Sequence, residues 1–231
     1  MRLEGHPADK PGRLVPEDGQ VEIVEDLHPF VGRGGVKLAH ALDRFGVSPQ
    51  GRVALDVGAS TGGFTDCLLQ RGAEKVFAVD VGYGQLDWKI QRDPRVVILD
   101  RKNARELSSG DLGEAVDLAV IDVSFISLRL VIPPVLAVLK SGGDLVALVK
   151  PQFEVGKGEV EKKGIVRDPE KHWKVLWELR EFIATLGWVV QGVSPSPITG
   201  QKGNQEFLIH AVNRGHGTPI EEEAMRRAMF P

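Results

Sequence analysis

Short apolar runs alternate with more polar or small-residue segments along the middle of the chain. Five of these runs are predicted as strands, at residues 53–56, 76–80, 96–99, 116–122 and 145–149. The runs are almost uniformly apolar, which is typical of strands buried on both faces of a parallel sheet. The segments between successive strands are long enough for crossover connections. The pattern therefore predicts an α/β fold.

Five helices are predicted around and between these strands, at residues 36–45, 64–71, 87–92, 133–139 and 170–186. Gly46 closes the first of them, and Asp168-Pro169 starts the last as an N-cap followed by a first-turn proline. Residues 188–193 and 206–213 are two further strands. The loop that joins them is too short for a crossover helix, so the last strand is predicted to be antiparallel. The sheet thus has seven strands and is mostly parallel.

Both ends of the chain differ from this regular pattern. Residues 1–28 contain many glycines and prolines, with one strand predicted at 21–24, and are too short for a core of their own. Residues 29–50 are a linker and N-terminal helix, and residues 51–213 form the main domain, with a long loop at 151–168. Residues 214–231 are expected to be a frayed tail with a helical stretch at 221–229.

Composition narrows the class of protein. The chain has 231 residues, 42% of them hydrophobic and 26% charged, and a single cysteine, Cys67. A disulfide framework is therefore impossible within the chain, and Cys67 is expected to be a small buried hydrophobe. No apolar run approaches the ~20 residues of a membrane helix, and residues 1–12 do not resemble a signal peptide. We expect a cytoplasmic protein without a membrane or metal site.

The net charge of −3 is unevenly distributed. Residues 17–26 carry five acidic residues and no basic ones, whereas residues 33–52 carry four basic residues and one acid, Asp43. A uniformly basic nucleic-acid binder is excluded, but a local basic surface is compatible with this distribution.

A glycine-rich loop after the first main strand has three competing interpretations. The run is Leu55-Asp-Val-Gly-Ala-Ser-Thr-Gly-Gly-Phe64. A dinucleotide fingerprint would need glycine in place of Ser60. A nucleophile elbow is matched literally by G-x-S-x-G, with Asp122 and then His172 or His210 following in the right order. The third interpretation is S-adenosylmethionine (SAM) binding, in which the loop holds the methionine end.

SAM binding also needs an acid at the tip of the second strand, where Asp80 lies about twenty residues after the loop. Asp80 either holds the ribose hydroxyls or only caps a turn. The segment Asp100–Asn103 follows the third strand and contacts adenine or forms a solvated turn. The residues predicted to bind SAM are Gly58, Ser60, Thr61, Gly62, Gly63, Phe64, Asp80, Val81, Asp100, Asn103 and Asp122.

Four charged residues occupy unusual positions. Asp122 and Lys150 each end an apolar strand, Lys37 opens the first helix, and Glu206 begins the last strand. Each alone is an ordinary surface charge or ion pair more often than a catalyst. Two lysines and two acids that frame one pocket, however, suggest acid–base chemistry.

At this point the chain resembles the TlyA family of FtsJ-like ribosomal RNA methyltransferases, over about residues 30–213. The matching stretches are RGGVK at 33–37, residues 55–73, AVDVGYGQLDW at 78–88, IDVSFISL at 121–128, LVKPQFE at 148–154, GIVRD at 164–168, SPITG at 196–200 and GNQEF at 203–207. The resemblance implies a Rossmann-like class I methyltransferase fold with SAM as cofactor. It also implies a catalytic tetrad of Lys37, Asp122, Lys150 and Glu206, and a ribose 2′-hydroxyl of ribosomal RNA as substrate.

The resemblance has two further implications. Family members usually begin with a small α-L-type RNA-binding domain, of which residues 1–28 resemble only the last part. Members are also labelled hemolysins, although nothing in the sequence is typical of a membrane-lytic helix. The alternatives are a non-catalytic RNA-binding protein with a SAM fold, a hemolysin-like membrane-active protein and a small-molecule methyltransferase.

In the mechanism that we expect, Lys150 is the general base that deprotonates the ribose hydroxyl. Burial and the second cation, Lys37, favour a neutral lysine at this position. Ribosomal RNA or a ribosomal subunit is the expected partner. Phe153 and Trp88 either stack on a base or belong to the core, with a core role favoured for each. The residues predicted to contact RNA are Arg33, Arg44, Lys157, Lys162, Lys163 and Arg167.

Overall fold

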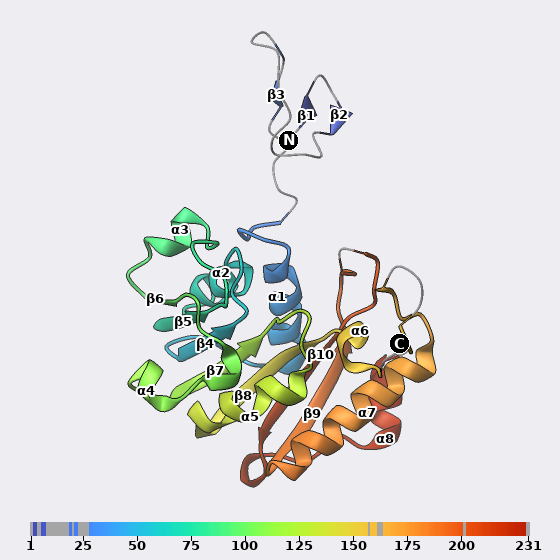
Figure 1. Ribbon diagram of the computed structural model, residues 1–231. Helices are drawn as coiled ribbons and strands as arrows, with labels where there is room; N and C mark the ends of the chain where they lie inside the picture. Colours follow the sequence, from blue (N-terminus) through green and yellow to red (C-terminus); the bar gives the residue numbers. More distant parts are fainter. Residues whose placement is uncertain are drawn as a thin grey trace.

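A seven-stranded mixed sheet forms the centre of the computed structural model (Figure 1). The structure describes residues 28–156, 158–160, 164–200 and 202–229, and before them residues 2–3, 6–7, 19 and 21–22. The sheet order is β6-β5-β4-β7-β8-β10-β9, and β10 runs in the direction opposite to the other six strands. The strands are β4 (Val53–Val57), β5 (Lys75–Val79), β6 (Val96–Leu99), β7 (Val116–Ile121), β8 (Leu139–Val149), β9 (Trp188–Pro195) and β10 (Phe207–Asn213). The predicted fold class is confirmed.

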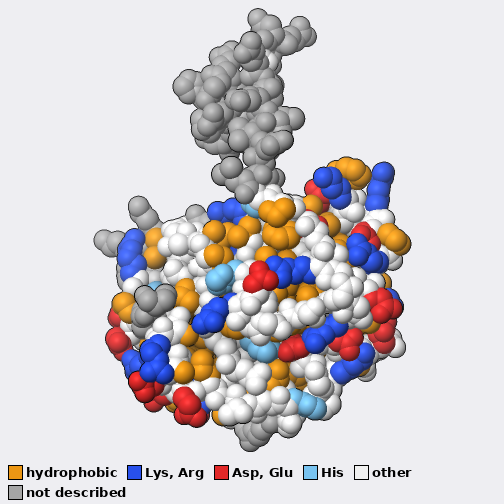
Figure 2. All heavy atoms as spheres, turned by 180° about the vertical axis from the view of Figure 1, so that it is seen from behind, with side chains coloured by type: hydrophobic (Ala, Val, Ile, Leu, Met, Phe, Trp, Pro, Cys, Tyr) orange, Lys and Arg blue, Asp and Glu red, His pale blue; other side chains and the backbone are white. Residues whose placement is uncertain are grey.

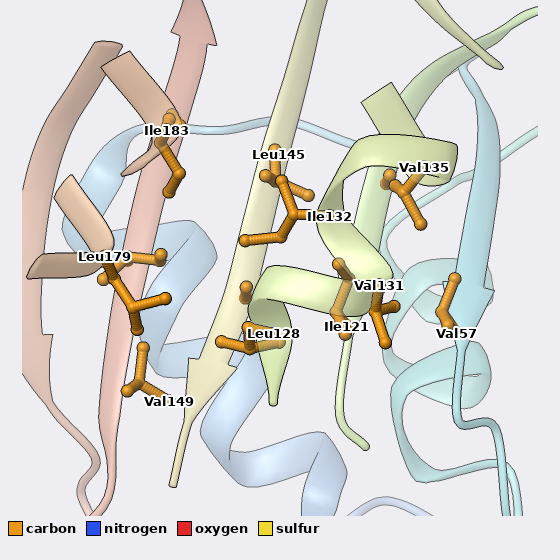
Figure 3. Close-up of a cluster of buried hydrophobic side chains, with 14 of the residues drawn as sticks. Val57, Ile121, Leu128, Val131, Ile132, Val135, Leu145, Val149, Leu179 and Ile183 are labelled. Atoms are coloured by element: carbon orange, nitrogen blue, oxygen red, sulfur yellow. The ribbon is translucent and has the colours of Figure 1, made fainter. Parts of the chain in front are cut away.

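Helices cover both faces of this sheet, because the side chains of each strand alternate between two hydrophobic clusters. On β7, Leu118 and Val120 belong to one cluster and Ala119 and Ile121 to the other. The first cluster includes α1 (Gly34–Phe45) and α2 (Gly63–Gln70), and α3 (Trp88–Gln91) adds Ile90. The second includes α4 (Ser109–Leu112), α5 (Leu128–Val138), α7 (Pro169–Thr185) and α8 (Glu222–Met229). Figure 3 shows α5 and α7 directing their aliphatic side chains toward β4, β7 and β8.

The direction of β10 determines what lies beside the end of β8. Parallel strands β4, β5, β7 and β8 all end at the same edge of the sheet, where ligands bind in open α/β folds. Because β10 is antiparallel, it begins at that edge, and Phe207 pairs with Val149. Glu206 therefore lies beside Lys150, although 56 positions separate them in the sequence.

Two elements differ most from their predicted bounds, and the loop predicted at 151–168 begins with a short helix, α6 (Pro151–Glu154). Strand β8 starts at Leu139, so Gly142-Gly143 lies inside the strand instead of forming a turn before it. A Cβ atom at Gly143 would lie 3.0 Å from the backbone oxygen of Asp117, and this close approach requires a glycine. Helix α5 starts at Leu128 and contains two prolines in its interior, where they each remove a helical hydrogen bond. Burial of Leu128, Val131 and Ile132 offsets that loss.

The two ends of the chain also add structure. Strands β1 (Arg2–Leu3), β2 (His6–Pro7) and β3 (Val21–Glu22) form a separate antiparallel sheet, so the strand predicted at 21–24 is observed over its first two residues. At the other end, the expectation of a frayed tail is wrong. Met225 and Met229 of α8 are buried in the core, and the Arg226 guanidinium lies 3.9 Å from the Trp173 ring centroid.

Candidate active site

A cavity of about 720 Å³ opens at the edge of the sheet where the parallel strands end. This volume is in the range of small-ligand sites. Its wall comes from six parts of the chain: the start of α1, the glycine loop after β4, the segments that directly follow β7 and β8, the loop before α7, and the segment that precedes β10. The lining residues that bear on the prediction are Arg33, Lys37, Gly58, Ser60, Thr61, Gly63, Phe64, Asp122, Ser124, Phe125, Lys150, Gln152, Phe153, Lys202, Asn204 and Glu206.

The glycines of the loop after β4 are required by close packing. A Cβ atom at Gly58 would lie 2.3 Å from the backbone oxygen of Asp122, and the backbone there has φ +88°. A Cβ atom at Gly62 would lie 3.1 Å from the side chains of Leu86 and Ile90, again with a positive φ of +96°. The loop therefore comes close to the end of β7 and leaves space for a ligand at the start of α2.

Asp80 caps a turn at the tip of β5, next to the glycine loop but outside the cavity lining, and its ribose-binding role stays a prediction. Its Oδ2 accepts a hydrogen bond from the backbone N–H of Ser60 at 2.8 Å, and its Oδ1 accepts one from Gly82 at 2.7 Å. It caps a turn and also joins the tip of β5 to the glycine loop. An ionised carboxylate has about four lone-pair sites, so two bonds leave capacity for ribose hydroxyls.

The other residues predicted near adenine lie around the same turn, outside the cavity lining. Asp100 accepts a hydrogen bond from the Gly84 N–H at 2.9 Å, and Asn103 caps a short 3₁₀ helix at Ala104–Glu106. Val81 is 71% exposed. These contacts leave the adenine role of the segment a prediction.

Lys150 has two partners on the neighbouring loop. Its Nζ lies 2.6 Å from Asp122 Oδ1 and donates a hydrogen bond to Ser124 Oγ at 2.8 Å. Both side chains of the ion pair are largely shielded, with 12% of Lys150 and 20% of Asp122 exposed. Shielding strengthens an ion pair but makes each charge dependent on its partner.

Lys37 forms the second pair. Its Nζ donates to Glu206 Oε2 at 2.5 Å, and both side chains are nearly buried. A Cβ atom at Gly200 would lie 2.5 Å from Glu206 Oε1, so this glycine lets the carboxylate approach the loop before β10. All four residues of the predicted tetrad therefore line one cavity, as two lysine–carboxylate pairs.

Asp56, for which the sequence predicted no role, is a carboxyl group beneath the glycine loop. Asp56 on β4 is fully buried and accepts a hydrogen bond from the Thr65 hydroxyl at 2.6 Å, while its Oδ1 has no partner among the described residues. Burial raises the pKa of Asp56 to about 7, and the negative charges of Asp122 and Asp80 act in the same direction.

The hydrolase interpretation of the loop does not fit the geometry. His172 Nε2 contacts the backbone oxygen of Val166 at 2.8 Å, and His210 Nε2 contacts Asp144 Oδ1 at 2.7 Å. Neither histidine lines the cavity that contains Ser60. A nucleophilic serine needs a base within hydrogen-bond reach, and neither candidate has that position.

The predicted RNA-contacting residues are only partly brought together. Arg33 lines the cavity, whereas Arg44 and Arg167 are exposed outside its lining. Lys157, Lys162 and Lys163 lie outside the described residues. On the face shown in Figure 2, basic and acidic side chains are interspersed, so a strong basic surface is not formed there.

Phe153, which the sequence offered as a stacking or core residue, forms an aromatic pair at the cavity with Phe125, which the sequence interpretation missed. Phe125 is 90% exposed and adopts φ +64°, an unusual conformation for a bulky residue, and its ring centroid lies 5.0 Å from that of Phe153. The position of Phe125 three residues after the strand-ending Asp122 was the available signal. Trp88, for which a core role was favoured, is 61% exposed, whereas Cys67 is buried as expected.

Comparison with known proteins identifies the family. The FtsJ-like methyltransferase family matches residues 30–213. The chain belongs to this family. It is 46% identical over 233 residues to the 16S/23S rRNA (cytidine-2′-O)-methyltransferase TlyA of Mycobacterium tuberculosis, a match that covers 99% of this chain and 87% of the relative. The predicted family is thus confirmed.

Solved structures agree with this assignment. A protein of Streptococcus thermophilus provisionally named a hemolysin has a TM-score of 0.86 and 40% identity, over 97% of this chain and 82% of its own. A SAM-dependent methyltransferase of Aquifex aeolicus has the same fold, with a TM-score of 0.53, 20% identity, and 78% and 93% coverage. The family and the fold are those of SAM-dependent methyltransferases, as predicted.

Membrane-spanning helices and metal-binding clusters are absent from the part of the chain that the structure describes. None of the described helices is both long and apolar enough to cross a membrane. No group of three or more His, Cys, Asp or Glu side chains among the described residues is arranged to hold a metal ion.

Proposed function

We propose that this protein transfers the methyl group of SAM to a ribose 2′-hydroxyl of ribosomal RNA. The observation that carries the proposal is the pair of lysine–carboxylate contacts, Lys150 with Asp122 and Lys37 with Glu206, facing one cavity beside the glycine loop. Methyl transfer to a hydroxyl needs an acceptor that is positioned and deprotonated, and lysines with nearby acids supply both functions. The name of the TlyA relative supports ribosomal RNA as the substrate.

The glycine loop and its neighbours fit the cofactor. Bound SAM supplies a methyl group activated by a positively charged sulfonium. Gly58, Thr61 and Gly63 line the cavity with backbone and small side chains, which allows close approach of a ligand. Asp80 would hold the ribose with the acceptor capacity that its two backbone bonds leave.

Lys150 is proposed as the general base. Ion pairing with Asp122 and the bond to Ser124 orient its Nζ into the cavity. A positive charge placed beside Asp122 competes with Lys150 for that carboxylate and disfavours the ammonium form. With its own extra proton lost to solvent, the neutral amine would accept the proton of the 2′-hydroxyl at Nζ, and the ribose oxygen would take the methyl group that bound SAM supplies.

Lys37 and Glu206 are proposed to hold the hydroxyl. Glu206 Oε2 accepts a hydrogen bond from Lys37 Nζ, so the two opposite charges balance each other. The pair presents both a donor and an acceptor to the ribose. Their near burial lowers the number of orientations that they adopt. Such preorganisation is the main contribution expected of residues that do not themselves transfer the proton.

The target nucleotide would enter through the mouth of the cavity. The exposed Phe125 and its neighbour Phe153 offer aromatic faces on which a base can stack. Arg33 and Lys202 line the same cavity and are suited to phosphate contacts. The relative's name makes cytidine the first nucleotide to test.

The test incubates the protein with methyl-labelled SAM and separate, unmodified small and large ribosomal subunits, followed by alkaline hydrolysis of the RNA. A 2′-O-methyl group blocks cleavage, so label in alkali-resistant dinucleotides establishes ribose methylation and identifies the subunit. The variant Lys150→Ala is expected to lose about 10²–10⁴-fold in rate and to retain SAM binding. Label in alkali-sensitive products would contradict ribose methylation.

Lys140→Ala is the matched control. Lys140 lies on β8, the strand that Lys150 directly follows, and pairs with Asp117 at 2.8 Å at the opposite end of that strand. Its removal is expected to leave methyl transfer unchanged. Equal rates for Lys150→Ala and the wild type would remove Lys150 from the mechanism, and absence of label in all samples with SAM binding intact would argue against ribosomal RNA as substrate.

A further inference from the structure

Two short loops carry the groups that would do the chemistry, and neither belongs to a long element. Residues 122–127 follow β7 and carry Asp122, Ser124 and Phe125. Lys150 directly follows β8 and is the N-cap of α6 (Pro151–Glu154), a single helical turn that carries Phe153. Segments this short hold a fixed geometry only when they are attached to something more rigid.

Glu154 makes that attachment. Its Oε2 accepts a hydrogen bond from Ser127 Oγ at 2.7 Å, and its Oε1 accepts one from the backbone N–H of Leu128 at 2.8 Å. Ser127 is the N-cap of α5 and Leu128 its first residue, so a carboxylate from another segment completes the start of this helix. The negative charge also lies at the positive end of the helix dipole.

The helix to which Glu154 is bound is firmly anchored. Leu128, Val131, Ile132 and Val135 of α5 are buried in the core between α5 and the sheet (Figure 3). Within α6, the Phe153 N–H donates to the Lys150 carbonyl at 2.9 Å. Glu154 therefore connects the backbone of Lys150, through one helical turn, to a rigid helix that begins where the Asp122 loop ends.

We propose that Glu154 is a positioning residue for methyl transfer, which sets Lys150 against Asp122 and Phe153 against Phe125 without touching either substrate. This inference rests on the proposed function. The carboxylate is half-buried, and burial raises its pKa, so this site retains an acid at an energetic cost. A purely local helix cap could instead be supplied by Ser127 alone, whose Oγ also accepts from the Arg129 N–H at 3.2 Å.

The first test compares Glu154→Ala with Glu154→Gln. The alanine variant is expected to lose roughly 10–100-fold in kcat, since small displacements of reacting groups have effects of this size, while its KM for SAM stays within about twofold. Glutamine can accept from the Leu128 N–H and donate to Ser127 Oγ, so Glu154→Gln is expected to restore most of the kcat. Ser127→Ala, which removes one of the two bonds and no buried carboxyl, is expected to lie between them.

Asp117→Ala controls for a general loss of stability. Asp117 Oδ2 accepts a hydrogen bond from the Val53 N–H at 3.0 Å at the opposite edge of the sheet, so it makes the same kind of contact away from the cavity. We expect this variant to melt at a lower temperature with an unchanged kcat. A wild-type kcat in folded Glu154→Ala, or an equal loss in the alanine and glutamine variants, would overturn the proposal.

A second readout does not depend on activity. In hydrogen–deuterium exchange of the full chain, Glu154→Ala is expected to speed exchange in both 122–128 and 150–155, whereas Glu154→Gln and Asp117→Ala leave these segments protected. Unchanged exchange in Glu154→Ala would overturn the positioning role even if the wild type transfers no methyl group to RNA. Absence of methyl transfer by the wild type would contradict the proposed function, and the exchange measurement would then decide the positioning role of Glu154 by itself.

Discussion

At the scale of single residues, Lys37 and Lys150 each pair with an acid, whereas the buried carboxyl of Asp56 faces a hydroxyl donor and negative neighbours. Asp56 lies on β4 with Thr65 as its hydrogen-bond donor, and the nearby charges of Asp80 and Asp122 are both negative. A buried acid of this kind is more stable protonated than ionised. Its protonation state is therefore linked to folding.

The linkage predicts how stability depends on pH. The pKa of Asp56 is raised to about 7 in the folded protein, whereas an unfolded chain has the ordinary value near ~3.9. Between these values the folded state holds a proton that the unfolded state has lost, so Asp56 makes the free energy of unfolding fall as pH rises from about 4 to about 7. Asp56→Asn is neutral throughout and is expected to flatten this dependence when the melting temperature is followed from pH 5 to 8.

Glu154 leaves a residual pH dependence of the melting temperature in Asp56→Asn. Its pKa is also raised, so it contributes a slope of the same sign that remains in Asp56→Asn. The double variant Asp56→Asn, Glu154→Gln serves as the reference for a chain without either contribution. Identical pH profiles for Asp56→Asn and the wild type would show that Asp56 is ionised in both the folded and unfolded states.

The sequence was informative about which residues enter the site and less so about their contacts. Charged residues at the ends of apolar strands stand out, because burial on both faces leaves the strand end as the only place for them. This reasoning found Asp122 and Lys150. The hydrogen bond from Lys150 to Ser124 and the exposure of Phe125 depend on how the backbone turns after β7. Phe125 has a positive φ there, which the local composition does not predict.

At the scale of elements, two features complete the domain: the antiparallel direction of β10 in the sheet and the packing of α8 against the hydrophobic core. The short loop before the last strand predicted an antiparallel β10 correctly, and this direction brings Glu206 to the cavity. The packing of α8 could not be inferred with the same ease, since only two of its eight residues, Met225 and Met229, are buried. Two apolar positions four residues apart in a polar terminal segment are also compatible with a free helix.

Removal of a side chain from α8 tests its contribution. Met225 is completely buried, so Met225→Ala is expected to lower the free energy of unfolding by about 2–4 kcal/mol through lost burial and the cavity left behind. Arg227→Ala breaks only an exposed pair with Glu223 on the same helix and is expected to cost about 0.3–0.5 kcal/mol. Urea denaturation measures both. Equal stabilities of the two variants would mean that α8 is detached from the core in solution. Both folded variants are expected to transfer methyl groups at the wild-type rate.

At the scale of the whole molecule, the cavity unites residues from Gly32 to Glu206, so its shape depends on the complete sheet and not on one motif. The positions of the strands along the chain were predictable because uniformly apolar runs reflect burial on both faces of a sheet. The pairing of Lys37 with Glu206 was not, because it joins α1 to β10 across 169 positions of sequence. A ligand that bridges such distant segments is expected to stabilise all of them together.

This dependence leads to a prediction about cofactor binding and Gly58. At a hundredfold excess over its dissociation constant, SAM is expected to stabilise the folded chain by about 2.7 kcal/mol, or roughly 5–10 °C in melting temperature. Gly58→Ala introduces a Cβ atom 2.3 Å from the backbone oxygen of Asp122, which forces the glycine loop away from the end of β7 and should abolish this shift. Gly46→Ala has the same unfavourable positive φ, but its Cβ atom meets nothing within 4 Å. Both variants should therefore melt at a lower temperature than the wild type, and only Gly46→Ala should retain the SAM-induced increase. A full increase in Gly58→Ala, followed by differential scanning fluorimetry, would show that SAM does not bind between these two strand ends.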